Sequence, residues 1–141
     1  MAGYSGTPLH KKLGIKPGHV VALIGAPEGW SIGALPDGVV IRTRAAGALD
    51  VIVAFFDDRI KLERRLPSLL RAVPDDGSLW IAWPRRAAGH VSDITDNALR
   101  VLVLPTGLVD TKVAALDDNW SGLRFVWRRE LRPSLRSAPR P

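Results

Sequence analysis

The chain has 141 residues, a length that suits a single domain with a core of its own. Its 46% hydrophobic and 24% charged residues exclude a wholly disordered chain, a collagen and a coiled coil. The net charge is +6, but residues 128–141 carry five arginines and one glutamate, so the rest of the chain is close to neutral. This distribution argues against a broad nucleic-acid-binding face, and the lack of cysteine excludes thiol nucleophiles, disulfides and cysteine-held metals.

The first residues predict an extended arm followed by a short helix. Residues 1–8 are rich in glycine, serine and proline, and residues 9–15 place two leucines on one helical face. The chain does not open with a basic and apolar leader, and no apolar run approaches the roughly 18 residues that span a bilayer. We therefore expect a cytoplasmic protein without a signal peptide and without membrane contact.

Four apolar runs predict the strands of a sheet that is covered on both faces, and the second run is apolar at its start and basic at its end. They cover residues 19–24, 39–44, 50–56 and 79–83. Residues between the first two runs, at positions 31 to 35, predict one helical turn. Only five residues, from position 45 to 49, link the second and third runs, and a helical crossover needs about a dozen. Either these two strands are antiparallel neighbours or the link crosses the edge of the sheet.

Two further helices follow the third and fourth runs. Asp57 and Asp58 open a helix of roughly 15 residues, whose apolar side chains recur at i, i+3 and i+4. Pro67 lies inside this helix and predicts a kink or a split. The next helix has Ser92 or Asp93 as its predicted N-cap.

The last regular element is predicted to be an antiparallel hairpin. Residues 109–116 and 123–128 alternate between apolar and polar, which is typical of half-exposed strands. Regular alternation places Asp110 and Lys112 on the same face of the first strand, where they could pair with each other.

This order of elements predicts an α/β fold: a shortened, mostly parallel, Rossmann-like sheet covered on both faces, with a C-terminal antiparallel hairpin. Residues 1–131 form this single domain, and residues 132–141, rich in proline, arginine and serine, form a disordered basic tail. Ligands of such sheets bind beyond the carboxyl ends of the strands. Residues 25–30, 56–58 and 83–86 are expected to converge there.

The order of strands, glycine loop and helices resembles that of S-adenosylmethionine-dependent methyltransferases. Residues 66–83 are similar to that superfamily's passage from a helix, through a proline-x-x-glycine turn, into a strand. More narrowly, the chain resembles the bacterial "domain of unknown function 3052" over roughly residues 3–130. The matching segments are residues 3–9, 12–16, 83–84, 107–113 and 117–123. This resemblance implies a methyltransferase-like fold and a cytoplasmic setting, and it implies no established activity.

The chain departs from that superfamily where the cofactor is held. The resemblance implies a glycine-rich turn after the first strand and an acidic residue at the end of the second, which binds ribose hydroxyls. Here the turn keeps only Gly25 and Gly29, Glu28 lies within it, and the second strand ends in Arg42 and Arg44. We therefore predict no cofactor. Arginines suit a phosphate better than a ribose, and these two would join the arginines after the fourth strand if the strands were neighbours.

Eight residues make up the candidate cleft, and each has a structural alternative. The loop of Gly25, Glu28 and Gly29 is either a weak phosphate cradle or a turn that leaves the strand. Trp30 either stacks on a ligand ring or closes the end of the core.

The other four candidates follow the third and fourth strands. Asp57 and Asp58 either act as a general base or Mg²⁺ ligand, or they cap the helix that follows. Trp83 and Arg85, next to Arg86, are the best indication of an anionic ligand, because guanidinium groups bind phosphate or carboxylate. The alternative is a surface loop in which the tryptophan is packed.

Two functions stay open at this point. The first is a non-catalytic binding or regulatory module on a degenerate methyltransferase-like scaffold, without predicted catalytic or metal-binding residues. Its ligand would be an anionic small molecule, and a homodimer or protein partner would use the hairpin edge, whereas nucleic acid is not expected. The alternative is a small enzyme or binding protein for a nucleotide or S-adenosyl compound in the cleft.

Overall fold

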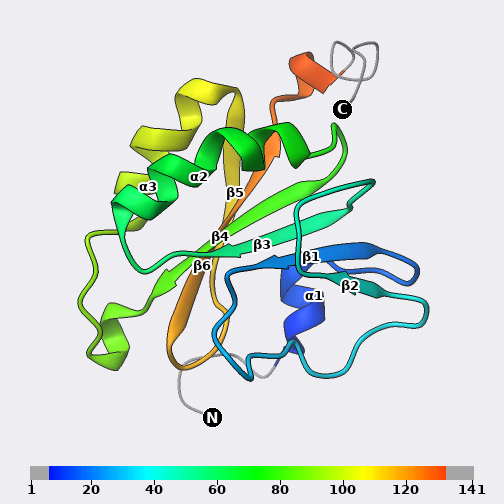
Figure 1. Cartoon of the computed structure of the whole chain (residues 1–141), viewed down its shortest axis with the longest axis horizontal. Helices are drawn as coiled ribbons and strands as arrows, with labels where there is room; N and C mark the ends of the chain where they lie inside the picture. The colour runs from blue at the N-terminus through cyan, green and yellow to red at the C-terminus, as the bar shows by residue number, and fades with distance from the viewer. Residues whose placement is uncertain (1–6, 133–141) are drawn as a thin grey trace.

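The structure, a computed structural model, describes residues 7–132; most of the predicted arm and nearly all of the predicted tail lie outside this range. One six-stranded sheet has the strand order β2-β1-β3-β4-β6-β5 (Figure 1). The strands are β1 (Val20–Ile24), β2 (Val40–Arg42), β3 (Val51–Phe55), β4 (Ser78–Pro84), β5 (Leu108–Ala115) and β6 (Trp120–Trp127). The helices are α1 (Leu9–Leu13), α2 (Arg59–Ala72) and α3 (Asp96–Val103), with single 3-10 turns at Arg86–Ala88, Leu104–Thr106 and Arg129–Leu131.

The sheet confirms the predicted fold class. Strands β2, β1, β3 and β4 are parallel, and β6 and β5 continue the sheet as the antiparallel hairpin. All four apolar runs contain a strand, although β2 keeps only three residues. No helix among residues 7–132 has the length and apolar character needed to cross a membrane.

A separate hydrophobic core lies on each face of the sheet. In β3, Ile52 and Ala54 pack beneath α2 and α3, which cover the same face (Figure 1). Val51, Val53 and Phe55 pack on the opposite face, beneath α1 and the loop that follows β1. Every residue of β3 is therefore buried, which explains its continuous apolar sequence.

The link between β2 and β3 corrects one of the two readings of the sequence. The two strands are not antiparallel neighbours, because each pairs in parallel with β1, on opposite sides of it. The link passes the first residue of β1, where Asp50 donates its N–H to the Val20 carbonyl at 2.8 Å and accepts the Val20 N–H at 2.8 Å. The connection can be short because it crosses one strand end instead of a sheet face.

Helix α2 is continuous through Pro67 and is not split in two. Asp58 is its N-cap and accepts the N–H of Lys61 at 2.8 Å. Leu62, Leu66 and Leu69 form its buried face, so packing against the sheet holds the helix together where proline removes one backbone hydrogen bond.

The N-cap of α3 is Thr95 and not Ser92 or Asp93. The Thr95 hydroxyl accepts the N–H of Ala98 at 3.1 Å, whereas Asp93 accepts the first N–H of α2, from Arg59, at 2.9 Å. Ile94, immediately before the cap, is buried, and this burial sets where the helix begins.

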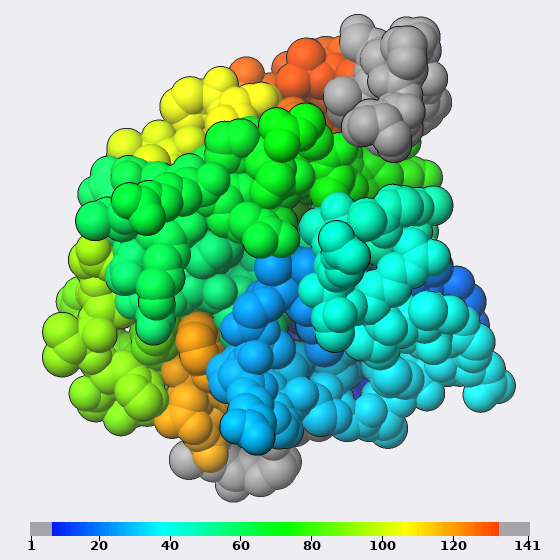
Figure 2. All heavy atoms as spheres, viewed as in Figure 1, coloured from blue at the N-terminus to red at the C-terminus, as the bar shows by residue number. Residues whose placement is uncertain are grey.

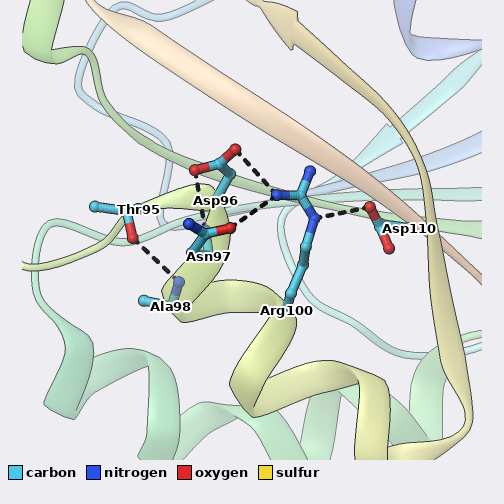
Figure 3. A network of polar contacts seen from close by, with 6 residues as sticks. All are labelled: Thr95, Asp96, Asn97, Ala98, Arg100 and Asp110. Atoms are coloured by element: carbon cyan, nitrogen blue, oxygen red, sulfur yellow. Dashed lines mark hydrogen bonds and ion pairs between the residues drawn. The ribbon is translucent and has the colours of Figure 1, made fainter.

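One arginine fastens α3 to the hairpin (Figure 3). Arg100 donates to Asp96 at 3.1 Å within the helix and to Asp110 of β5 at 2.9 Å. These carboxylates, Asp110 first, raise the pKa of Arg100. Asp110 is therefore engaged with the helix.

A β-bulge explains why Asp110 does not pair with Lys112. Asp110 lies opposite Phe125 and Lys112 lies opposite Arg124, so Thr111 is an extra residue in β5. The extra residue turns Asp110 towards α3, while Lys112 reaches the opposite face and donates to the Lys12 carbonyl of α1 at 3.3 Å.

The predicted helical turn at residues 31–35 is also wrong. Gly33 has φ +87°, outside the right-handed helical region, and its N–H donates to the Ser31 hydroxyl at 3.0 Å. The segment instead runs across the sheet and buries Ile32 in the core on the α1 face.

Candidate functional site

A cleft opens at the carboxyl edge of the sheet, beside the point where the strand order reverses. β1 connects to β2 on one side and borders β3 on the other, and such switch points are where open α/β sheets bind ligands. The cleft has a volume of about 700 Å³. Its lining residues are Gly25, Pro27, Phe55, Phe56, Asp57, Lys61, Pro84, His90, Asn119 and Trp120.

Three aromatic side chains support the wall of the cleft. The Phe55 ring lies edge-to-face with Trp30, at a centroid distance of 4.7 Å, and with Trp120, at 5.1 Å. The Trp30 indole N–H donates to Asp117 at 2.9 Å, which ties the loop after β1 to the β5–β6 turn. Figure 2 shows these two segments, in blue and orange, next to each other below the green surface of α2.

Gly25 lets the chain leave β1 close to the neighbouring strand. It has φ +67°, and a Cβ atom at this position would lie 3.1 Å from the Phe55 carbonyl oxygen. Glycine is therefore needed for the turn and for close approach to β3. The space beside Gly25 is occupied by the neighbouring strand.

Of the three titratable side chains that line the cleft, Asp57 and Lys61 are bonded to each other, and His90 lies against Asn119. Lys61 donates to Asp57 at 3.1 Å and lies 3.9 Å from Asp58, the N-cap of α2. The hydrogen bond from Lys61 lowers the pKa of Asp57, and the same bond raises the pKa of Lys61. An ionised Asp57 that already accepts from a cation is a weak proton acceptor, and Asp58 is used as the N-cap of α2.

The segment between β4 and α3 borders the opening of the cleft. His90 Nε2 lies 3.0 Å from the Asn119 side-chain oxygen, and the Ser92 hydroxyl donates to the Asp57 carbonyl at 3.3 Å. These contacts hold the segment against both the hairpin turn and the end of β3.

Trp83 and Arg85 lie in a second, smaller pocket of about 300 Å³. It shares Pro84 and His90 with the cleft. Arg85 donates to the carbonyls of Asp117 and Asp118, at 3.4 and 3.3 Å, and the Trp83 side chain is packed in the core beneath α2.

The structure thus places four of the eight candidate residues in the cleft or the adjoining pocket and four outside both. Gly25 and Asp57 line the cleft, and Trp83 and Arg85 line the adjoining pocket. The other four line neither of these two: Trp30 supports the aromatic wall, Asp58 caps α2, and Glu28 and Gly29 are exposed in the loop after β1.

The proposed grouping of Arg42 and Arg44 with the arginines after β4 is wrong. β2 is the edge strand, and β1 and β3 separate it from β4. Arg42 instead donates to the Ala46 carbonyl at 3.0 Å, within its own loop.

The sequence reading missed the contribution of the hairpin to the cleft. β6 is antiparallel to β4, so its first residue, Trp120, pairs with the last residue of β4, Pro84. The predicted hairpin already contained the signal, because an antiparallel last strand beside β4 has to begin at the carboxyl edge of the parallel strands.

The end of β2 does not carry the carboxylate that the resemblance implies for a ribose diol. That position holds Arg42, whose guanidinium is bonded to its own loop. Within residues 7–132, no three histidine, aspartate or glutamate side chains form a metal-binding group.

Solved structures similar to this chain include a pre-rRNA processing protein and a ribosomal protein methylase. A fibrillarin pre-rRNA processing protein from Methanococcus jannaschii matches 89% of this chain and 70% of its own, with 12% identity and a TM-score of 0.58. The ribosomal protein L11 methylase of Lactobacillus delbrueckii subsp. bulgaricus matches 86% and 76%, with 13% identity and a TM-score of 0.53.

A third structure, TrmN from Thermus thermophilus, matches 85% of this chain and 47% of its own, with 14% identity and a TM-score of 0.54. Identities this low show the fold alone, and the fold is methyltransferase-like. No protein-family model and no curated protein sequence matches the chain, so the resemblance to domain of unknown function 3052 stays a prediction.

Proposed function

We propose that the chain is a binding module with a methyltransferase-like fold, which holds a small anionic molecule in the cleft and does not transform it. The observation that carries the proposal is an aromatic-walled cleft at the switch point of the sheet, whose carboxylate, Asp57, is bonded to Lys61. Pockets for small molecules are mostly apolar and have few polar groups, which fix the orientation of the ligand.

The polar rim of the cleft supports an anionic ligand. Lys61 and His90 can each donate to it, and Asp57 is already neutralised by Lys61. Phe56 and Trp120 line the cleft, and aromatic side chains there favour a ligand with a ring or another planar apolar part.

The alternative is an enzyme or binding protein for a nucleotide or S-adenosyl compound. The fold favours it, because the similar structures include a methylase. The arginine at the end of β2 counts against it, as does the carbonyl of Phe55 beside Gly25.

Thermal unfolding with a ligand panel separates the two functions. The panel contains 8-anilinonaphthalene-1-sulfonate as an aromatic anion, together with adenosine, ATP and S-adenosylmethionine. A ligand at 100 times its dissociation constant stabilises the protein by about 2.7 kcal/mol, or roughly 8 °C at this chain length. We expect the aromatic anion to raise Tm and S-adenosylmethionine to leave it unchanged.

Two neighbouring substitutions localise the binding. Asn119→Trp fills the cleft, and Asp118→Trp adds the same bulk one residue earlier, at an exposed position outside the cleft lining. Loss of the Tm shift in Asn119→Trp alone is the expected result. Equal shifts in both variants, or no shift in the parent protein, would exclude the cleft. Methyl transfer by the parent protein would establish the alternative.

The outer edge of β5 is the surface we propose for a protein partner or a second copy. β5 is the last strand of the sheet, and Val113 at its centre is 57% exposed. Light scattering should detect a dimer in the parent protein and a monomer in Val113→Lys. A parent protein that is monomeric and captures no partner would contradict the assignment.

A further inference from the structure

Three cations gather on the hairpin and the turn after it, outside the cleft. Lys112 and Arg124 lie directly opposite each other on β5 and β6. Both face the side of the sheet that carries α1, because Lys112 bonds to the Lys12 carbonyl and Arg124 is the register partner of Trp80, whose indole donates to the Leu13 carbonyl. Like charges at directly opposed positions of a sheet repel each other and destabilise the pair.

The third cation, Arg132, adds to the repulsion. Burial lowers the pKa of Arg124, and the positive charge of Arg132 lowers it further. In the same way, burial and the charges of Lys112 and Arg85 lower the pKa of Lys12. Positive side chains therefore gather at and beside the hairpin, where burial and the neighbouring cations make each positive charge less favourable.

Carboxylates do not neutralise the three side chains. Lys112 donates to the Lys12 carbonyl at 3.3 Å, Arg124 to the Thr111 hydroxyl at 3.1 Å, and Arg132 to the Trp127 carbonyl at 3.2 Å. All three acceptors are neutral, and within residues 7–132 no carboxylate lies at ion-pair distance from any of the three cations.

The bulge in β5 removes the acid that could have neutralised the cluster. Without the extra residue Thr111, Asp110 would share a face with Lys112; with it, Asp110 is on the other face and pairs with Arg100 (Figure 3). Each of the three cations donates through one nitrogen to the acceptors named above, whereas a guanidinium has five N–H groups and an ammonium has three. The remaining donors suit an oxyanion with several acceptors.

We propose that Lys112, Arg124 and Arg132 form a binding site for a phosphate group, supplied by a small phosphate compound or by an RNA backbone. None of the three lines the cleft, so this site is independent of the proposed function. In the sequence, the excess of positive charge lies at the end of the chain, and this pattern does not predict the site. The site is revealed by the register of β5 and β6, which places Lys112 opposite Arg124.

Titration calorimetry with tripolyphosphate and with a short single-stranded RNA tests the site. The parent protein should bind at least one of the two, and Arg124→Gln should bind it about tenfold more weakly. Arg64→Gln, an equal charge change at an exposed position of α2 on the other face, should bind within twofold of the parent protein. Binding of neither probe, or an equal loss in Arg64→Gln, overturns the proposal.

A second variant shows whether a loss of affinity in Arg124→Gln comes from a folding defect. Lys112→Thr changes an exposed residue and removes the opposed charge, so it should lose affinity while its Tm is unchanged or higher. Retained affinity in a folded Lys112→Thr protein would also overturn the proposal.

The salt dependence of binding and the comparison of the two probes identify the source of the phosphate. Three contacts with single-stranded RNA predict that affinity falls about 20-fold between roughly 50 and 200 mM salt. Tight binding of tripolyphosphate alone would identify a small phosphate compound. Binding of RNA with the expected salt slope would identify the backbone, and RNA binding that is insensitive to salt would contradict the site.

Discussion

Asp117 joins two loops that are far apart in the sequence. One carboxylate oxygen accepts the backbone N–H groups of Asn119 and Trp120, each at 2.8 Å, and the other accepts the Trp30 indole at 2.9 Å. The residue therefore shapes the β5–β6 turn and fixes the loop after β1 against it. Because the cleft lies between these loops, its shape depends on this one side chain.

Asp117→Ala should lower the free energy of unfolding by about 2 kcal/mol, because three donors lose a charged acceptor. Asp118→Ala is the matched control, because Asp118 is exposed and it is the Asp118 backbone carbonyl that accepts from Arg85, at 3.3 Å. Its substitution should change stability by less than about 0.5 kcal/mol. Urea unfolding measures both variants, and equal losses would show that the turn sequence matters instead of the Asp117 contacts.

Lys12 predicts a dependence of stability on pH. Burial, followed by the charges of Lys112 and Arg85, lowers its pKa below the usual value of 10.5. The unfolded chain then binds more protons than the folded one between that lowered pKa and 10.5, so the free energy of unfolding rises with pH across this window.

Replacing Lys12 by methionine should remove this rise. From about pH 7 to about pH 10, the stability of the parent protein should increase relative to that of Lys12→Met. Lys11→Met, at the exposed neighbouring position, should keep the parent profile. A Lys12→Met profile parallel to the parent one would show that this lysine titrates normally.

At the scale of elements, the sequence predicted the strands, whose positions depend on burial. It did not predict the start of α3 or the bulge in β5, which depend on single residues. The apolar runs predicted the strands because a strand buried on both faces has to be apolar throughout. The position of the α3 cap was missed, since Ser92, Asp93 and Thr95 all suit an N-cap and only the burial of Ile94 selects among them. The bulge at Thr111 was missed because alternation alone does not reveal an extra residue.

At Pro67, tertiary packing keeps α2 helical although proline disfavours the interior of a helix. The proline is exposed and removes a backbone hydrogen bond from a helix that nevertheless continues for 14 residues. Pro67→Ala should therefore raise the free energy of unfolding by about 1–3 kcal/mol. Chemical denaturation measures the change, with Arg64→Ala as a control at an exposed position of the same helix. A loss of stability would mean that proline acts chiefly by restricting the unfolded chain.

At the scale of the whole molecule, the strand order was the part of the fold that the sequence left open. Strand patterns do not say which strand lies between which, so β1 could not be placed between β2 and β3. The unknown strand order also affected the candidate site. Arg42 and Arg44 could join the arginines after β4 only if β2 were next to β4, and β1 and β3 lie between these two strands. Residues at the ends of β1 and β3 were placed correctly at one edge, because parallel strands align their carboxyl ends.

The two cores share one sheet, and this predicts a single cooperative unfolding transition. Trp30, Trp80 and Trp120 belong to the core on the α1 face, and Trp83 and Trp127 belong to the core beneath α2 and α3. Adjacent residues of the same strand serve opposite cores, so neither core can open while the central strands keep the other intact.

A double and a triple variant make each core visible separately by fluorescence. Trp83→Phe with Trp127→Phe leaves only the tryptophans of the α1 face, and the replacement of Trp30, Trp80 and Trp120 by phenylalanine leaves only the two of the other face. Within each variant, the urea midpoints from fluorescence and from far-ultraviolet circular dichroism should coincide. A fluorescence midpoint that precedes the dichroism midpoint in one variant alone would show that its core opens first, and that the chain is two cooperative units instead of one.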